Sequence, residues 1–287
     1  MQTWVSPDQR QAPPNSDGGG RSQAPGARLR AEAVSFAYRG LEVLRSVSVD
    51  VKPGRVVGVL GPNGSGKTTL IRCLLGVLPP QSGRVLLDEV DIRQVGRRAY
   101  ALRVAAVPQE MPTDFPLRVG ELVLLGRLPH LPAGGLGFET AADHAAAEAA
   151  LAACGVRALA ERSINEISGG ELRRVFIARA LCQAAPVLLL DEPTGGLDLK
   201  HQLAILELLR GQAASGVAVL VVLHDLNLAA AVCDELILLK DGATAASGTP
   251  DEVLTAETVA EVYGVRMTTA NTGDLPGGRR FLVPAPP

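Results

Sequence analysis

Short apolar segments alternate with longer stretches of helical periodicity along most of this chain. The strongest apolar runs, at residues 56–60, 187–190 and 217–223, have the length of strands. Strands that are apolar at every position indicate a parallel sheet whose two faces are both covered by helices. Because such strands alternate with helical segments, the pattern predicts an α/β fold.

Further strands and helices are expected around these runs. Residues 29–36 and 43–51 have β-type patterning, with apolar residues alternating in the second, and Pro53-Gly54 closes the pair as a turn. A short strand and turn are expected at 82–92, and strands at 104–107 and 235–239. Helices are expected over about 67–78, from 199 and from 226.

The chain divides into a central domain, an inserted lobe and two tails. Residues 116–185 have helical periodicity, broken by a glycine-rich stretch at 131–137, and indicate a helical lobe over about 110–185. Residues 1–27 are rich in Pro, Gly, Ser and Gln, and we expect a disordered tail there. The domain is expected over 28–265, and a tail over 266–287 that could form a β-hairpin turning at Pro276-Gly277-Gly278.

Composition narrows the class of protein. The 287 residues carry a net charge of -2 and a pI near 6.1, which gives no support for a nucleic-acid partner. The positive mean hydropathy of +0.19 is explained by buried strands and alanine-rich helices such as 141–153. No apolar run approaches the roughly 18 residues that span a bilayer, and no signal-peptide core is visible near the N-terminus. We therefore expect a chain that is at most peripheral to a membrane.

The cysteines and histidines do not indicate a structural metal or disulfide framework. Neither the cysteines nor the histidines have a metal-ligand spacing. We expect buried free thiols and no stable metal other than Mg²⁺. The residues concerned are Cys73, Cys154, Cys182 and Cys233, with His130, His144 and His201.

A phosphate-binding loop lies between a predicted strand and a predicted helix. The segment fits GxxxxGK[ST] at every fixed position and reads Gly61-Pro62-Asn63-Gly64-Ser65-Gly66-Lys67-Thr68. Its glycines let backbone N–H groups surround phosphate oxygens, and the following helix adds the positive end of its dipole. Lys67 is expected at the β- and γ-phosphates of ATP, Thr68 on Mg²⁺, and Thr69 beside them. The strand–helix context disfavours the alternative, an ordinary glycine turn.

Two further strand ends carry candidate catalytic groups. Asp191 ends a buried strand, where a carboxylate can hold Mg²⁺, and Glu192 follows it as a candidate general base for an attacking water. His224 follows the strand 217–223 and can reach the terminal phosphate as a hydrogen-bond donor. Taken alone, each would be read as a solvated acidic strand end or a structural histidine. The phosphate-binding loop changes that interpretation.

From residue 29 to residue 265 the chain resembles the ABC ATPase family. The decisive segment is Ile167-Ser168-Gly169-Gly170-Glu171 before a helix, which is similar to the family's signature motif. Ser168 can also cap that helix, and the capping geometry directs N–H groups at phosphate. The resemblance implies a P-loop NTPase sheet lobe with an antiparallel β subdomain and an inserted helical lobe that carries the signature.

The same resemblance implies roles for other residues. Tyr38 stands where the family places an aromatic ring on adenine, although a half-buried strand residue is the alternative. Gln109 resembles the Q-loop glutamine, which touches Mg²⁺ or the attacking water and senses the permease. Asp198 resembles the D-loop aspartate that communicates across a dimer. ATP would bind between the loop of one subunit and Ser168, Gly169 and Gly170 of the other.

Two departures from the family pattern are visible. Glu171 stands where glutamine is commoner, and Leu172-Arg173 replaces a more usual polar pair. The D-loop begins with Gly195-Gly196 where serine or asparagine is frequent. Neither departure removes a phosphate ligand or the base, so we expect ATP hydrolysis with looser signalling between subunits.

The resemblance further implies a head-to-tail homodimer at the cytoplasmic side of the cell membrane, docked on a separate transmembrane permease. Four segments resemble the ATPases of iron–siderophore, haem and cobalamin importers: 124–130, 224–229, 248–250 and 262–265. The resemblance therefore implies a substrate-binding protein as an indirect partner of this chain. Generic packing is the alternative for these segments. No residue of a cytosolic ATPase needs to touch the cargo, so the sequence does not identify the cargo. The rival classes are an exporter or other metal importer, a soluble ABC ATPase and a P-loop kinase. An assay of released phosphate would separate the kinase from an ATPase.

Overall fold

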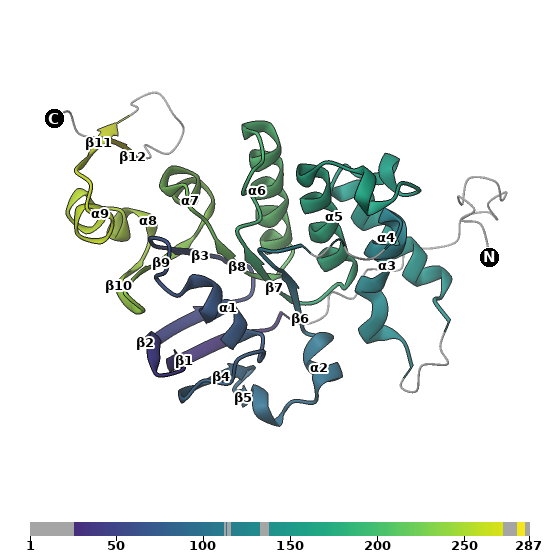
Figure 1. The fold of residues 1–287 in the computed structure, drawn as a ribbon, viewed down its shortest axis with the longest axis horizontal. Coiled ribbons are helices and arrows are strands. Elements are labelled where there is room, and N and C mark those ends of the chain that lie inside the picture. The colour runs from purple at the N-terminus through teal and green to yellow at the C-terminus, as the bar shows by residue number, and fades with distance from the viewer. Residues whose placement is uncertain (1–25, 112, 114–115, 133–137, 272–279, 285–287) are drawn as a thin grey trace.

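The computed structural model describes residues 26–111, 113, 116–132, 138–271 and 280–284. Within this part of the chain the main sheet has six strands in the order β10-β9-β3-β8-β7-β6 (Figure 1). The parallel members are β3 (Val56–Leu60), β6 (Val104–Val107), β7 (Val187–Asp191), β8 (Ala218–Val222) and β9 (Glu235–Lys240). The antiparallel edge strand β10 (Ala243–Gly248) was not predicted, because its alanines, serine and threonine lack the apolar pattern of a buried strand.

Both faces of the main sheet are buried, as the continuous apolar runs predicted. In β7, Leu188 and Leu190 face one core and Val187 and Leu189 face another. Successive side chains of a strand point to opposite faces, so each strand contributes to both cores. One core includes residues of α5 (Gly169–Cys182), α6 (Leu199–Ala214) and α7 (Leu226–Val232), and the other includes α1 (Lys67–Leu74) and a second sheet.

That second sheet is the antiparallel β subdomain. Its order is β2-β1-β4-β5 among the described residues, and it lies beside α1 (Figure 1). Leu29 pairs with Val51 in the neighbouring strand and with Leu87 on its other side. The strands are β1 (Leu29–Tyr38), β2 (Leu41–Val51), β4 (Ser82–Leu87) and β5 (Val90–Asp91).

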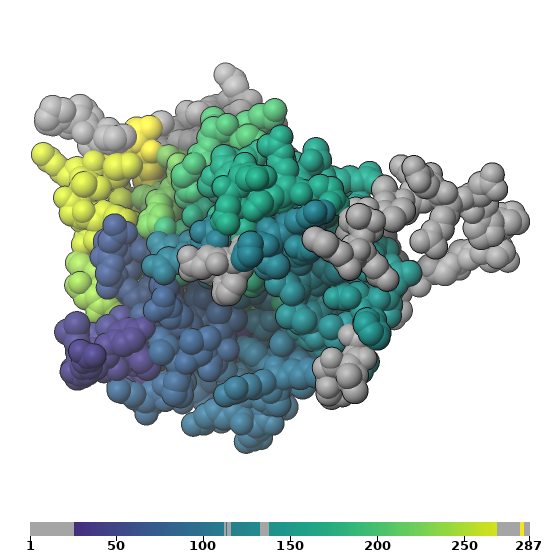
Figure 2. Space-filling model, turned by 45° about the vertical axis from the view of Figure 1, so that its right-hand side comes forward, coloured from purple at the N-terminus to yellow at the C-terminus, as the bar shows by residue number. Residues whose placement is uncertain are grey.

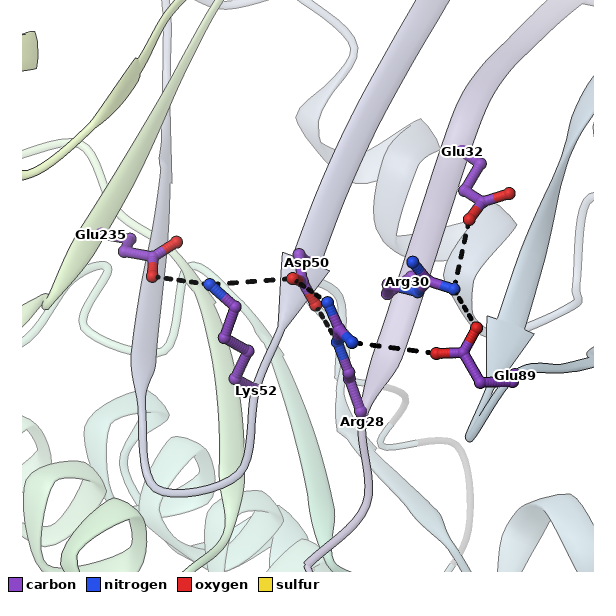
Figure 3. Close-up of polar contacts among 7 residues, drawn as sticks. All are labelled: Arg28, Arg30, Glu32, Asp50, Lys52, Glu89 and Glu235. Carbon is purple, nitrogen blue, oxygen red and sulfur yellow. Dashed lines mark hydrogen bonds and ion pairs between the residues drawn. The ribbon is translucent and has the colours of Figure 1, made fainter.

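A chain of charged side chains connects the two sheets (Figure 3). Lys52 follows β2, and its Nζ lies 3.2 Å from Glu235 Oε1 at the start of β9 and 3.7 Å from Asp50 Oδ2. Arg28 continues the chain, with its Nη2 2.6 Å from Asp50 Oδ2. These pairs are partly exposed, so each contributes little free energy. They bridge the end of β2 to the first residue of β9.

The helical lobe is inserted between β6 and β7 and is packed around α5 (Figure 1). Alanine, which favours helices most strongly, fills much of α4 (Ala141–Ala153), and Thr140 caps that helix with Asp143 in a reciprocal capping box. The other elements of the lobe are α3 (Val119–Leu124), η3 (Leu125–His130), α4 (Ala141–Ala153), η4 (Arg157–Leu159) and η5 (Ile164–Glu166).

A buried ion pair holds three elements of this lobe together. Arg127 Nε in η3 lies 2.8 Å from Asp143 Oδ1 in α4, and Arg127 Nη1 donates to Cys182 O at the end of α5. The Asp143 side chain is only 7% exposed. The Arg127 guanidinium and the Thr140 hydrogen bonds hold the pKa of the Asp143 carboxyl well below its usual range. Sequence analysis did not identify this pair.

Several short elements complete the fold. They are η2 (Ile92–Gln94), α2 (Arg97–Ala101), α8 (Pro250–Val253), α9 (Ala256–Tyr263) and the antiparallel pair β11 (Met267–Asn271) and β12 (Arg280–Pro284). The side-chain amide of Asn227 in α7 pairs with both backbone groups of Leu282, at 3.1 and 2.9 Å. The pair β11–β12 therefore packs on the helix that follows His224. The expected turn at 276–278 lies outside the described residues.

Some boundaries differ from those expected. Helix α1 ends at Leu74 rather than near residue 78, because Gly76 takes a left-handed φ of +68°. Ala27 is fully buried, although a tail was expected to run to about residue 27; residues 1–25 lie outside the described part. Helices α8 and α9 were not predicted, yet Thr249 and Thr255 cap them in recognisable patterns.

The surface view places the subdomains side by side. The β1–β2 region (purple) lies below the C-terminal elements (yellow) on one side of this face, and the helical lobe (teal) lies on the other side of the blue segment (Figure 2). Among the described residues no helix combines the length and apolar character needed to cross a bilayer.

Replacing Asp143 with alanine is expected to lower the free energy of unfolding by about 3 kcal/mol, because Arg127 would stay buried without its counter-charge. Urea unfolding measures the change. The matched control is Glu148→Ala in the same helix: Glu148 pairs with the exposed Arg157 at 2.8 Å, so the loss should not exceed about 1 kcal/mol.

The stability difference between wild type and Asp143→Ala should also depend on pH. The pKa of Asp143 is lower in the folded protein than in the unfolded chain, so the ionised carboxylate stabilises the folded state at any pH above the unfolded pKa. The stability difference between wild type and variant should therefore be fully present at neutral pH. It should shrink as the pH falls below about 4, the ordinary value for an aspartate. A difference that stays constant down to pH 2 would contradict the ion-pair account.

Candidate nucleotide site

The predicted site residues converge because parallel strands end at one edge of a sheet. The loop 61–68 follows β3, Gln109 lies just after β6, Glu192 follows β7 and His224 lies just after β8. These strands are hydrogen-bonded neighbours in the main sheet. Ligands of open α/β sheets bind at this edge, outside the carboxyl ends of the strands.

A cavity of about 630 Å³ opens at this edge. Its lining residues among those described are Val43, Asn63, Gly64, Gly66, Lys67, Thr68, Thr69, Gln109, Glu192 and His224. The structure thus brings together residues from β2, the phosphate-binding loop and three further strand ends. Val43 was not predicted, since nothing in its position within the alternating pattern of β2 distinguishes it from a packing residue.

The loop has a backbone that only glycine can adopt at two of its positions. Gly61 has φ +146°, and a Cβ built on it would lie 2.3 Å from Leu239 O. Gly66 has φ +100°, and its Cβ would lie 2.8 Å from Val43 O. Left-handed φ values and close backbone approach both exclude a side chain. The two neighbouring strands therefore fix the shape of the loop.

Lys67 is held at the base of the loop. Its Nζ donates to Gly61 O at 2.8 Å and to Pro62 O at 2.9 Å, and the residue is 6% exposed. Burial lowers the pKa of Lys67, and the carboxylates of Glu192 and Asp191 oppose that shift. The result is a positive charge fixed beside backbone N–H groups at the start of α1, an arrangement suited to phosphate.

Asp191 and Thr68 fit a divalent cation. Burial raises the pKa of the Asp191 carboxyl, while a hydrogen bond from Thr68 and the charge of Lys67 lower it. Asp191 Oδ1 is buried and has no hydrogen-bond partner in the described chain. A carboxylate, a hydroxyl and the amide of Gln109 are the oxygen ligands that Mg²⁺ prefers. The residues present therefore fit Mg²⁺ beside a bound triphosphate.

Glu192 and His224 form a contact across the cavity. His224 Nε2 lies 2.6 Å from Glu192 Oε1, and the Glu192 side chain is 17% exposed. Glu192 has φ +53°, which is uncommon for a residue with a side chain and typical of functional sites. A carboxylate held in this way in the lining of the cavity can accept a proton from water.

The signature segment lies outside this cavity. Ser168 caps α5: its Oγ accepts from Glu171 N–H at 3.3 Å, and Glu171 Oε2 accepts from Ser168 N–H at 2.8 Å. Glutamate and glutamine serve equally in such a capping box, so Glu171 preserves the local structure. Open space lies where a Cβ on Gly169 would stand. In the described chain Ser168, Gly169 and Gly170 do not line the cavity.

The remaining predicted residues lie around the site. Asp198 caps α6 and accepts from His201 N–H at 2.9 Å and from His201 Nδ1 at 2.7 Å. Tyr38 ends β1, is 39% exposed and packs edge-on against Phe36 at 4.9 Å. Neither lines the cavity in the described chain. Ser65 lies within the loop with its Oγ buried and without a hydrogen-bond partner among the described residues.

Arg173 is a further residue of the site that sequence analysis noted only as a departure. Its guanidinium in α5 donates to the backbone carbonyl of Glu192. The sequence indicated only that Arg173 departs from the family pattern, and nothing in it predicted the contact with the Glu192 carbonyl.

The family model described as "ABC transporter" matches residues 44–195. This segment contains the loop 61–68, Gln109, the signature segment, Asp191 and Glu192. His224 and Asp198 lie beyond it.

Two relatives cover most of the chain. The hemin import ATP-binding protein HmuV of Rhizobium meliloti is 39% identical over 89% of this chain and 98% of its own. The cobalamin import ATP-binding protein BtuD of Halobacterium salinarum is 41% identical over 86% of this chain. This chain spans 61% of the length of that BtuD protein.

A solved structure has the same fold. The dimeric structure of MJ0796, a bacterial ABC transporter cassette, matches with a TM-score of 0.70 and 28% identity. The match covers 77% of this chain and 98% of that cassette.

Gly61→Ala is expected to weaken ATP binding by about tenfold or more. Its Cβ would overlap Leu239 O, and the strain of about 1–3 kcal/mol would be relieved by moving the loop; tenfold corresponds to about 1.4 kcal/mol. Titration with a fluorescent ATP analogue measures the Kd. The control is Gly211→Ala in α6, where the new methyl group meets no atom within 4 Å beyond its chain neighbours and its own helix backbone, and binding should be unchanged. Wild-type affinity in Gly61→Ala would show that the loop geometry is not required.

Proposed function

The chain belongs to the ABC transporter family, and on that premise we propose that it is the ATP-binding and ATP-hydrolysing subunit of a membrane importer. The observation that carries this proposal is the cavity of about 630 Å³ in which Lys67, Glu192 and His224 come together. The proposed domain extends over residues 28–265. The import direction is supported by relatives that are named import ATP-binding proteins.

In this proposal the loop 61–68 binds the phosphates of ATP. Lys67 exchanges its carbonyl partners for β- and γ-phosphate oxygens, and Thr69 lies beside the phosphates. Mg²⁺ would be held by Thr68, Asp191 and Gln109, and when bound it neutralises charge on the phosphates. Tyr38 at the end of β1 is proposed to stack on adenine, since the residue is 39% exposed.

Glu192 is proposed to act as the general base. It takes one proton from a water molecule whose oxygen attacks the γ-phosphorus, and the bond from that phosphorus to the bridging oxygen of ADP breaks. His224, 2.6 Å from the Glu192 carboxylate, fixes its orientation. Once the nucleotide is bound, His224 is also within reach of the γ-phosphate as a donor. The products are ADP and inorganic phosphate.

A second copy of the chain is proposed to complete each site. Ser168, Gly169 and Gly170 are presented at the start of α5 and do not line the cavity of their own chain among the described residues. A head-to-tail dimer would place them on the nucleotide bound to the other copy, with Asp198 at the boundary. The dimeric cassette MJ0796, which shares the fold, supports this arrangement. Two-fold symmetry makes two equivalent sites.

Closing and opening of this dimer are proposed to drive a separate permease. The γ-phosphate supplies contacts that favour the closed state, and its loss on hydrolysis removes them. The chain would act at the cytoplasmic side of the membrane, with a substrate-binding protein as an indirect partner and no nucleic acid. The cargo class that the relatives' names and the resemblance support is iron–siderophore, haem or cobalamin.

Glu192→Gln is expected to retain ATP and to lose turnover. The amide keeps the shape of the side chain but cannot take the proton, and a general base contributes about 10²- to 10⁴-fold. Released phosphate measures turnover, and a fluorescent ATP analogue measures binding. We also expect the variant to accumulate as a dimer with Mg–ATP, because the contacts of the γ-phosphate persist.

The control for this substitution is Glu207→Gln, an exposed position on α6 away from the cavity. It should hydrolyse ATP at the wild-type rate. Wild-type turnover in Glu192→Gln would show that the base is another residue. A wild-type protein that transfers phosphate to a small molecule and releases none would contradict the ATPase itself.

A further inference from the structure

Arg173 joins the signature helix to the segment that follows β7. Its Nη1 donates to the backbone carbonyl of Glu192. A Cβ built on Gly195 would lie 3.5 Å from the same nitrogen. The guanidinium is therefore packed over the turn 192–195, and it approaches from the helix that begins at the Ser168 cap.

The carbonyl that Arg173 contacts belongs to a residue under unusual constraint. Glu192 O also accepts from Gly195 N–H at 3.2 Å, and the Glu192 backbone has φ +53°. A left-handed conformation in a non-glycine residue persists only where its surroundings impose it. Arg173 and Gly195 hold the backbone of Glu192, while His224 holds its carboxylate at 2.6 Å.

Arg173 also lies near the N-terminal end of α5, where the signature segment is located. It lies five residues after Ser168 in a 14-residue helix, so the two are about 7.5 Å apart along the axis. Gly170, in the first turn of α5, also lies close to Leu197, because a Cβ built on Gly170 would be 2.9 Å from Leu197 Cδ2. A shift of the first turn of α5 would therefore move the groups that hold the segment 192–197.

We propose that Arg173 is a positioning residue for Glu192, and that it transmits the position of the signature segment to the general base of the same subunit. The proposal rests on the proposed role of Glu192. In the head-to-tail dimer, Ser168 of one subunit contacts the nucleotide bound by the other. Capture of that nucleotide would then align the base at the subunit's own site, so that Arg173 couples the two sites.

The chemistry of the side chain suits this role. Arginine has a planar fork of donors and stays charged when partly buried, and burial lowers the pKa of Arg173 while Glu192 opposes that shift. Lysine at the same position keeps the charge and one donor, but on a flexible stem. Methionine keeps similar length and loses every donor.

The test compares Arg173→Met with Arg210→Met. Arg210 Nη1 donates to Val232 O at 2.7 Å, a matched contact from a helix to a backbone carbonyl away from the cavity. We expect Arg173→Met to lower kcat about 10- to 100-fold, the effect of misplacing a reacting group by about 1 Å. Its Kd for Mg–ATP should stay within about twofold of wild type, because the substitution removes the contact with Glu192 O and no group that binds phosphate. Arg210→Met should leave both kcat and Kd unchanged.

A double variant separates positioning from a structural effect. In the Glu192→Gln background the base is already absent, so adding Arg173→Met should lower kcat by less than about twofold. Arg173→Lys should recover part of the lost kcat, because one donor can still reach the carbonyl. If Arg173→Met does not fold, Arg173→Lys is assessed by the same split between kcat and Kd, and by the same double variant.

The outcomes that overturn the inference are defined against an active wild type. A wild-type kcat in Arg173→Met, a parallel loss of kcat and ATP affinity in folded protein, or a full additional loss in the Glu192→Gln background would each exclude positioning of the base. A wild-type protein that hydrolyses no ATP would instead refute the proposed function. The two failures are therefore distinguishable.

Discussion

The parallel strands of the main sheet are buried on both faces and end together at one edge. Burial of the alternating residues of β7, such as Leu188 and Leu189, holds the sheet between two cores. Because β3, β6, β7 and β8 are neighbours in that sheet, their following residues converge on one cavity. Chemical groups that lie as far apart in the sequence as Asn63 and His224 are thereby collected at one edge. The antiparallel subdomain closes the arrangement, since Val43 in β2 both limits Gly66 and lines the cavity.

The sequence predicted the parts of this arrangement that depend on local pattern. Continuous apolar runs predicted the parallel strands, and GxxxxGK[ST] predicted the loop 61–68, because both are written in consecutive residues. The ion pair Arg127–Asp143 and the contact of Arg173 with Glu192 join segments 16 and 19 residues apart, and no periodicity reports such pairs. Edge strand β10 was missed because its alanines, serine and threonine lack the apolar pattern of a buried strand. The roles of Tyr38 and Asp198 stay predictions, since neither lines the cavity in the described chain.

The site contains polar groups that the described chain does not satisfy. Ser65 Oγ and Asp191 Oδ1 are buried without hydrogen-bond partners among the described residues. Buried polar atoms are ordinarily paired, so such groups indicate a ligand or water. The open space at Gly169 and the capped start of α5 give a second incomplete surface. The proposal of a nucleotide held between two copies explains both features with one geometry, and Arg173 gives the two surfaces a physical connection.

The most direct test of this account mixes two inactive variants, Lys67→Ala and Ser168→Arg. Each homodimer has two defective sites, but a mixed dimer combines the intact loop of the second variant with the intact signature of the first. If each site is built from two copies, mixing should restore ATP hydrolysis, up to roughly a quarter of the wild-type rate for random pairing and independent sites. If loop and signature serve the same site within one chain, the mixture will be no more active than the sum of its components. That second result would contradict the account.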